Sequence, residues 1–294
     1  MSQDVQSAEN NGRRDGNAPK PVAYLHSYLH GGASSLICTV ITFPVYKTVF
    51  RQQLHSTLIQ QTVAQLYKEG LLKLYRGVAP PLLMKTLQGT ILFGFQNTLL
   101  QQLSPWAEPL LPRLMLPAVA GLGTGVVEAL IFNPFERVQC ILQNNRNDQC
   151  LPTISKIMAR MRSEPLAYGW YRGFLPTLVR NATGSSLYFG IKGPVSNALN
   201  EQHFPPVASS FISGMVSSLV ISLPLYPVSV LVANMQAQVG EENLGLRGSW
   251  NQLWQKRQKS LVLLYRGGSL VILRSCISWG IITLIYDLLS RHTS

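Results

Sequence analysis

Three basic residues stand at nearly equivalent places in three apolar stretches of the sequence. Each follows the glycine of a Tyr-Arg-Gly triplet by seven or eight residues: Lys85 after Gly77, Arg180 after Gly173 and Arg274 after Gly267. In a helix that separation is about 10–12 Å, which is near the middle of a hydrocarbon layer ~30 Å thick. Because a charge at that depth is costly and usually functional, we expect the three cations to face one site.

One acidic residue, Glu128, belongs to the same region. It stands six residues before Pro134, and the corresponding residues in the other thirds of the chain are Cys38 and Ile221. Three cations and one acid favour an anionic ligand, because arginine binds phosphate through two nitrogens and lysine supplies a point charge. A ligand with two phosphates and a cationic ring would suit this set. The alternative is that Glu128 neutralises Arg180 in an internal ion-pair network that touches no ligand.

Four further residues lie close along the same segments and are secondary candidates for ligand contact: Gln88, Asn181, Ser278 and Trp279. Trp279 could stack on a base or serve only in packing. The sequence has no nucleophile–base pair, metal-ligand cluster or phosphate-binding glycine loop, so we expect neither an enzyme nor a metal site. The four cysteines lack metal-site spacing and indicate free thiols: Cys38, Cys140, Cys150 and Cys276.

The candidate residues belong to a pattern that occurs three times. A proline is followed nine residues later by a glutamine: Pro44 and Gln53, Pro134 and Gln143, Pro227 and Gln236. Each pair is followed by a triplet: Tyr75-Arg76-Gly77, Tyr171-Arg172-Gly173 and Tyr265-Arg266-Gly267. A period of about 93 residues is too long for a solenoid and predicts three copies of a two-helix unit. We place these units at 23–113, 114–206 and 207–294, after a polar tail at 1–22 that we expect to be disordered.

The composition favours a membrane protein. Hydrophobic residues make up 46% of the chain and charged residues 13%, whereas soluble domains carry about 25% charge. Six apolar segments have about the length that crosses a bilayer: 23–43, 79–100, 114–133, 174–198, 207–226 and 268–290.

The net charge of +12 would suit binding to nucleic acid or to anionic lipid. Fifteen of the 25 basic residues, however, fall in three stretches: 51–79, 137–175 and 237–268. This is a positive-inside pattern rather than a continuous basic groove, so we expect membrane lipid and no nucleic acid as partner.

The repeated residues suit a membrane environment. The three prolines should end or kink the odd-numbered segments, and the linkers beyond them contain amphipathic stretches near 59–67, 154–161 and 250–254. We expect these stretches to lie at the interface; a soluble loop is the alternative. In each triplet the tyrosine suits the aromatic belt, the arginine can reach headgroups, and the glycine exposes backbone N–H groups where a helix begins. We therefore expect anionic lipid at the triplets, with cardiolipin as structural lipid and no covalently bound cofactor.

The repeated pattern resembles the mitochondrial carrier family. In its signature, an acidic residue stands two positions after a proline and a basic residue stands three positions after the acid. A second basic residue and a glutamine follow at alternate positions. The family repeats this signature three times. The resemblance covers about 23–290 and includes Glu69-Gly70. It implies six tilted helices around a central substrate cavity, three matrix helices and alternating access across the inner mitochondrial membrane. Both termini would face the intermembrane space.

The chain departs from this signature at the matrix gate. The acid positions hold Tyr46, Glu136 and Ser229, and the base positions hold Val49, Gln139 and Val232. We assign these six residues to the gate together with the three repeated glutamines. Since only one of the six is charged, the usual ring of salt bridges cannot form in full. The gate is then held by glutamine, tyrosine and apolar packing, or it leaks, or the protein does not cycle as a standard exchanger.

Several strings resemble the branch of the family that contains the mitochondrial NAD carrier, and the chain is most similar to a divergent member of that branch. They include Pro134-Phe135-Glu136-Arg137-Val138-Gln139, Arg180-Asn181 and Ser278-Trp279-Gly280-Ile281-Ile282. The resemblance implies substrate contact for the matching residues: Lys85, Glu128, Arg180 and Arg274.

We therefore predict an all-α, six-helix carrier, acting as a monomer, that moves an organic anion such as NAD+ or a related nucleotide cofactor. The sequence leaves open another nucleotide, coenzyme A or a carboxylate as cargo. It also leaves open a degenerate carrier-like protein that binds lipid or a partner and does not transport.

Overall fold

A computed structural model describes residues 21–55, 57–70, 74–75, 78–107, 115–147, 150–240, 244–274 and 277–278. Within these ranges the description omits the side chains at 21–35, 85–86, 88–94, 97, 104, 106–107, 145, 206–207 and 210. The described residues form helices with short connections and contain no strand. The predicted all-α class is therefore confirmed.

Five long helices make up most of the described fold: α2 (Pro21–His55), α5 (Ala79–Ala107), α6 (Leu116–Gln143), α9 (Phe174–Glu201) and α10 (Pro206–Gln236). Shorter helices connect them: α3 (Ile59–Glu69), η1 (Asn145–Asn147), α7 (Ile154–Ser163), α8 (Leu166–Gly169), α11 (Gly245–Lys256) and α12 (Leu261–Leu264). A further helical segment covers 268–274.

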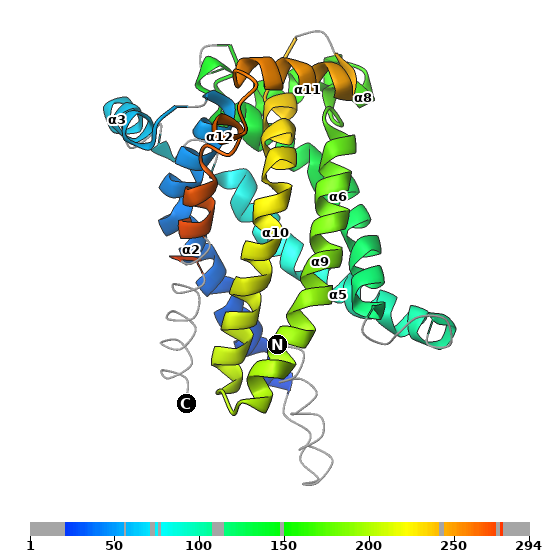
Figure 1. The fold of residues 1–294 in the computed structure, drawn as a ribbon. Coiled ribbons are helices and arrows are strands. Elements are labelled where there is room, and N and C mark those ends of the chain that lie inside the picture. Colours follow the sequence, from blue (N-terminus) through cyan, green and yellow to red (C-terminus); the bar gives the residue numbers. More distant parts are fainter. Residues whose placement is uncertain are drawn as a thin grey trace.

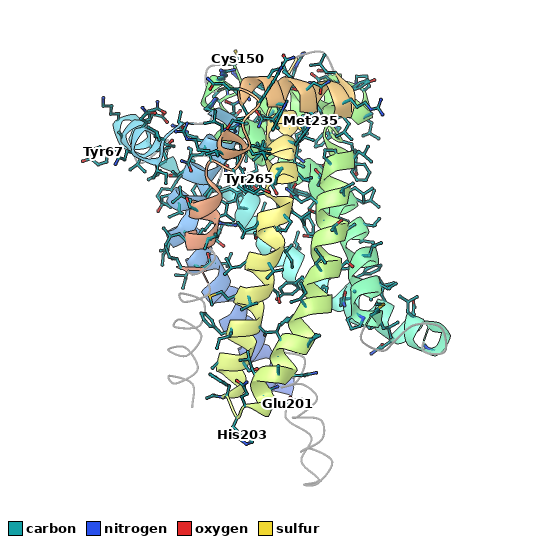
Figure 2. The ribbon with its side chains drawn as sticks, in the orientation of Figure 1. Tyr67, Cys150, Glu201, His203, Met235 and Tyr265 are labelled. Atoms are coloured by element: carbon teal, nitrogen blue, oxygen red, sulfur yellow. The ribbon has the colours of Figure 1, made fainter. Side chains whose placement is uncertain are left out.

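The long helices pack in chain order around a closed ring. α2 contacts α5, α5 contacts α6, α6 contacts α9, α9 contacts α10, and α10 contacts α2. Figure 1 shows α8, α11 and α12 gathered at one end of this bundle, where α6 and α10 end. Figure 2 places Cys150 at the same end and Glu201 and His203 at the other. The ring leaves an interior that side chains from several helices can share.

The repeated prolines lie inside helices rather than at their ends. Pro44 is within α2, Pro134 within α6 and Pro227 within α10. Each helix continues for about a further nine residues to the repeated glutamine, so the apolar segments expected to stop at 43, 133 and 226 are extended. A proline removes one helical donor and frees the carbonyl four residues earlier, and a helix can continue where another group satisfies that carbonyl.

The tyrosines of the triplets pack beside these prolines. Around Pro134, the freed carbonyl is that of Leu130, and the hydroxyl of Tyr171 donates to it at 3.2 Å. In the first repeat, the Tyr75 ring stacks on the ring that precedes the proline, with centroids 5.9 Å apart. In the third, the Tyr265 ring stacks at 5.8 Å on the ring that precedes Pro227. Each tyrosine thus ties the start of one long helix to the bend region of the helix before it.

Small residues bring α6 and α9 into close contact. A Cβ atom at Gly121 would lie 2.6 Å from the carbonyl oxygen of Ser185, and one at Gly125 would lie 2.4 Å from that of Asn181. These distances are too short for any side chain. Gly121 and Gly125 thus form a small-xxx-small contact whose partner is the backbone of α9.

The amphipathic stretches of the linkers are helices, which excludes the alternative of a plain loop. In α7, Ile157 and Met161 are buried against the end of α6, whereas the adjacent Met158 is exposed. In α3, Leu66 is buried, and Tyr67 is 89% exposed and extends away from the bundle in Figure 2. Their position at a membrane interface stays a prediction.

Two of the described helices are long and apolar enough to cross a membrane: Leu116–Gln143 and Phe211–Gln236. Length and composition alone give weak support, because the core helices of soluble proteins pass the same test. Many positions along the long helices are small or polar, which lowers their mean hydropathy. Six spans are therefore not established by this criterion.

Candidate substrate site

A cavity of about 380 Å³ lies inside the ring, within the size range of ligand sites, about 300–1,000 Å³. It is lined from α2, α6, α9, α10 and the segment 268–274. Four of the residues predicted to contact substrate line it: Glu128, Arg180, Asn181 and Arg274. Eight of the predicted gate residues line it as well: Tyr46, Val49, Gln53, Glu136, Gln139, Ser229, Val232 and Gln236. The structure thus brings residues from all three sequence repeats onto one interior surface.

The remaining predicted contacts are not all testable in the described residues. The side chains of Lys85 and Gln88 and the whole of Trp279 lie outside the description. Ser278 is described but does not line the cavity; its carbonyl oxygen lies 3.4 Å from the Cys38 thiol. Of the cysteines, Cys38, Cys140 and Cys150 are free thiols as expected, and Cys276 is outside the description.

Arg180 is held by a carboxylate of the gate. Its Nη2 atom donates to both Glu136 oxygens, at 2.7 and 2.8 Å, and its Nε donates to Asn181 Oδ1 at 2.9 Å. The sequence had offered Glu128 as the neutralising partner, and the ion pair is made by Glu136 instead. Glu128 is 8% exposed and accepts a hydrogen bond from the Ser185 hydroxyl at 3.4 Å. Within the described residues, Glu136 therefore makes the hydrogen-bonded ion pair with Arg180, and Glu128 is hydrogen-bonded to Ser185.

Arg274 has a different environment from Arg180. Its guanidinium carbon lies 5.2 Å from the centre of the Tyr46 ring, which is a cation–π distance. Among the described residues it has no ion pair, and its buried Nε has no hydrogen-bond partner. Arg274 is consequently the cavity cation with the most hydrogen-bonding capacity left for a ligand within the described structure.

The gate is held without a ring of charges. The Tyr46 hydroxyl accepts a hydrogen bond from Gln139 Nε2 at 2.6 Å, linking an acid position of one repeat to a base position of the next. Ser229 donates only to Leu225 of its own helix, and Val232 is buried. Among the three alternatives left open by the sequence, the described residues favour a gate of glutamine, tyrosine and apolar packing.

The apolar part of this gate is a cluster drawn from the three proline-containing helices. It consists of Phe50, Leu54, Cys140, Ala233 and Ala237, all buried. We call this cluster the apolar plug. It packs α2, α6 and α10 together just beyond the cavity, so it closes the end of the bundle at which these helices stop.

The repeated glutamines have separate roles. Gln236 is fully buried, and its Nε2 donates to Asn133 and Thr177, both at 3.1 Å, which ties α10 to α6 and α9. The carbonyl of Gln53 accepts from Asn234 at 3.0 Å. Gln143 is 1% exposed, does not line the cavity, and neither of its amide atoms has a hydrogen-bond partner in the described residues.

Arg257 is a structural residue that sequence reasoning missed. It is fully buried, and its guanidinium donates to the carbonyls of Gln52, Gln53 and Leu263. Burial lowers the pKa of this guanidinium from its ordinary value, although arginine stays protonated at neutral pH. No spacing rule distinguishes this basic residue from its exposed neighbours, because two of the three carbonyls it binds belong to α2, more than 200 residues away in the sequence.

The triplets differ from expectation at one arginine. Arg172 is 4% exposed and donates to the Gln238 side chain at 2.7 Å, so the expected orientation toward lipid headgroups is wrong for this residue. Gly173 has a positive φ of +77° at the N-cap of α9, which explains the need for glycine there. Arg76 and Gly77 lie outside the description, and Arg266 and Gly267 lie within it. Lipid binding by the triplets stays a prediction.

Comparison with known proteins identifies the family. The family model described as mitochondrial carrier protein matches residues 20–105 and 113–203, which is more than half of the chain. The chain belongs to the mitochondrial carrier family. Carriers of this family are transporters rather than enzymes, and membership implies the mitochondrial inner membrane.

Three relatives illustrate the range of similarity. Solute carrier family 25 member 53 of Homo sapiens is 46% identical over 272 residues, covering 91% of this chain and 88% of that protein. The mitochondrial nicotinamide adenine dinucleotide transporter SLC25A51 of Mus musculus is 34% identical, covering 92% and 90%. The mitochondrial 2-oxodicarboxylate carrier of Rattus norvegicus is 28% identical, covering 87% and 91%. The resemblance to the branch with the NAD carrier is thereby confirmed.

Proposed function

We propose that this carrier moves an anionic nucleotide cofactor, NAD+ or a close relative, through the central cavity by alternating access. The observation that carries the proposal is the presence of Arg180 and Arg274 on one cavity with Glu128. Two guanidinium groups can bind the two phosphates of a dinucleotide, and a carboxylate suits a cationic ring. Relatives named as nicotinamide adenine dinucleotide transporters support this cargo.

The same proposal includes the wider architecture. Six membrane-spanning helices in three repeats would surround the cavity, with the sixth helix beginning at 268, Lys85 supplying a third cation and both termini toward the intermembrane space. The protein would act as a monomer, with cardiolipin bound at the triplets. The closed ring of contacts and the matching tyrosine contacts beside the prolines support three equivalent units.

Substrate binding would be coupled to the gate through Arg180. In the structure Glu136 forms an ion pair with this guanidinium. A phosphate that binds Arg180 must compete with Glu136, so binding would free a carboxylate of α6 next to the Tyr46–Gln139 link. The cargo would also draw the helices together through its own charges, which replaces part of the missing salt-bridge ring. A ligand shifts a conformational equilibrium only by its differential affinity for the two states, and displacement of Glu136 supplies such a difference.

A carboxylate cargo is the second candidate. It is favoured by relatives named as mitochondrial 2-oxodicarboxylate carriers, since a dicarboxylate would also pair with two arginines. Against it, the cavity presents Glu128 and Glu136, and a small dianion has no cationic group to pair with either of them.

Ligand-dependent thermal stability of the purified carrier tests these alternatives. In detergent with cardiolipin, NAD+ should raise the unfolding temperature of the wild type but not of Arg274→Ala. Stabilisation by a dicarboxylate alone would replace the cargo and keep the site. If no nucleotide or carboxylate stabilises the protein while cardiolipin does, the non-transporting alternative is correct.

A further inference from the structure

A second cavity, of about 270 Å³, lies on the other side of the apolar plug from the central cavity. Phe50, Cys140 and Ala233 of the plug line the central cavity. Leu54 and Ala237 of the same plug line the second one. The second cavity is therefore in line with the first, at the end of the bundle where α2, α6 and α10 stop. In Figure 2, Met235, which also lines it, lies close beneath α11.

Three basic residues from different parts of the chain line this second cavity. They are His55 at the end of α2, Arg146 in η1 and Lys256 at the end of α11. None of the described lining residues is acidic. Arg146 and Lys256 are exposed at the rim, so their charges can meet an incoming ion before it is fully desolvated.

Two amide side chains present donors to the same space. Gln238 accepts a hydrogen bond from Arg172 at its Oε1, and Asn144 accepts one from the backbone N–H of Arg146 at its Oδ1. When the oxygen of an amide is already occupied in this way, its remaining capacity is two N–H donors. Neither amide nitrogen donates a hydrogen bond within the described part of the chain. These nitrogens therefore offer donors to a ligand that only accepts.

Two of the carbonyls at the ends of the surrounding helices are bonded by other side chains. Helix C-termini end in free carbonyls, which oppose an anion. Here the Gln53 carbonyl is bonded by Asn234 and Arg257, and the Ala237 carbonyl is bonded by Asn147 at 3.3 Å. These bonds reduce the opposition of two carbonyls to an anion, while the lining side chains supply positive charge and amide donors.

We propose that this second cavity binds a phosphate group, separately from the central substrate site. A phosphate matches the combination of two cations at the rim, a histidine and amide donors. The cavity volume of about 270 Å³ is large enough for it. The site would collect a phosphate-bearing anion directly behind the plug, on the side that the proposed orientation turns toward the matrix. The position on the matrix side rests on the proposed function, whereas the binding itself does not depend on which cargo is carried.

Equilibrium binding of inorganic pyrophosphate to the full-length carrier in detergent tests the proposal. The measurement is made in the Arg274→Ala background, which disables the central site. Replacing both rim cations, Arg146→Gln with Lys256→Gln, should weaken binding at least tenfold. The exchanged pair Arg146→Lys with Lys256→Arg should retain binding. A matched double variant, Arg162→Gln with Lys259→Gln, removes two exposed charges that do not line the cavity and should bind as its parent does.

A second measurement separates a soluble anion from a lipid headgroup. Vesicles of phosphatidylcholine with and without cardiolipin replace pyrophosphate, with the same variants. Dependence on Arg146 and Lys256 in the pyrophosphate arm identifies a soluble phosphate, and dependence in the cardiolipin arm alone identifies a lipid headgroup. Equal weakening by the matched control, or no effect of the rim variant in either arm, would overturn the proposal. Loss of all pyrophosphate binding in Arg274→Ala would also overturn it, since only the central site would then bind anions; NAD+ binding to the wild type tests the proposed function independently.

Discussion

Replacing Glu136 by glutamine should make the carrier bind its anionic cargo more tightly. This carboxylate accepts two hydrogen bonds from Arg180 Nη2, at 2.7 and 2.8 Å. Cargo that uses Arg180 must first displace it. Glutamine has nearly the same shape but no charge, so it competes less well with a phosphate for the guanidinium. The expected result is thus opposite to the usual loss of affinity on mutating a residue that lines a binding cavity.

The size of the effect follows from the exposure of the pair. Hydrogen bonds to charged groups contribute about 1.5–3 kcal/mol net. The two side chains are 22% and 20% exposed, so solvent screens part of their attraction and we take the lower end, about 1.5 kcal/mol. Since about 1.4 kcal/mol corresponds to a factor of ten in affinity, the Kd for cargo should fall about tenfold in Glu136→Gln.

The assay is equilibrium binding of NAD+ to purified protein, with unfolding temperature recorded in parallel. Glu69→Gln is the matched control, because it breaks an ion pair of the same type, with Arg51 at 2.6 Å, away from the cavity. Both variants should lose some stability without ligand, and only Glu136→Gln should bind more tightly. An unchanged or raised Kd in Glu136→Gln would refute competition and indicate that Glu136 positions Arg180 for the cargo.

Three other substitutions test the packing and the gate. Gly125→Ala should destabilise the protein by about 1–3 kcal/mol, as overpacking does, because its Cβ would meet the backbone of α9 at 2.4 Å; thermal unfolding measures this. Tyr46→Phe removes the hydrogen bond from Gln139 but keeps the ring, so we expect about 1 kcal/mol less stability of the closed gate and faster leak of a small anion from proteoliposomes. Gly173→Ala places a side chain at a φ of +77°, and the left-handed conformation should cost about 1–2 kcal/mol in chemical unfolding.

Each of these predictions has a result that would contradict it. Gly193→Ala is the control for the two glycine variants, since its Cβ would meet nothing within 4 Å. If Gly125→Ala were as stable as this control, the close approach of α6 and α9 would be contradicted. If Gly173→Ala were as stable, the cost of the left-handed conformation would be contradicted. For the gate, an unchanged leak in Tyr46→Phe would show that the apolar plug closes the bundle without the hydrogen bond.

The repeated residues predicted the helices and much of the cavity surface. Arg180 and Arg274 occupy matching places after the triplet glycines, and because helical geometry fixes depth, both reach the same interior. Their partners were not predictable in this way. Whether Arg180 meets Glu128 or Glu136 depends on the relative rotation and shift of α6 and α9, which the backbone contact at Gly125 sets. Sequence spacing within one helix carries no information about this register.

The triplets show the same division between local and distant effects. Gly173 and Gly267 lie at the starts of helices as expected, since the conformational freedom of glycine acts locally; Gly77 lies outside the described residues. The sequence left open whether the helix ends or kinks at Pro134, because the freed carbonyl is satisfied by Tyr171, which lies outside that helix, just before α9. The inward orientation of Arg172 depends likewise on Gln238, which lies just after the end of α10 and 66 residues away in the sequence.

Uptake of labelled NAD+ into proteoliposomes, compared between the wild type and Arg274→Ala, tests the central claim most directly. Arg247→Ala, an exposed residue of α11 that does not line the cavity, is the matched control. We expect saturable uptake by the wild type and the control, and background uptake by Arg274→Ala with its unfolding temperature retained. Uptake by Arg274→Ala equal to that of the wild type, or no uptake by folded wild type, would contradict the account.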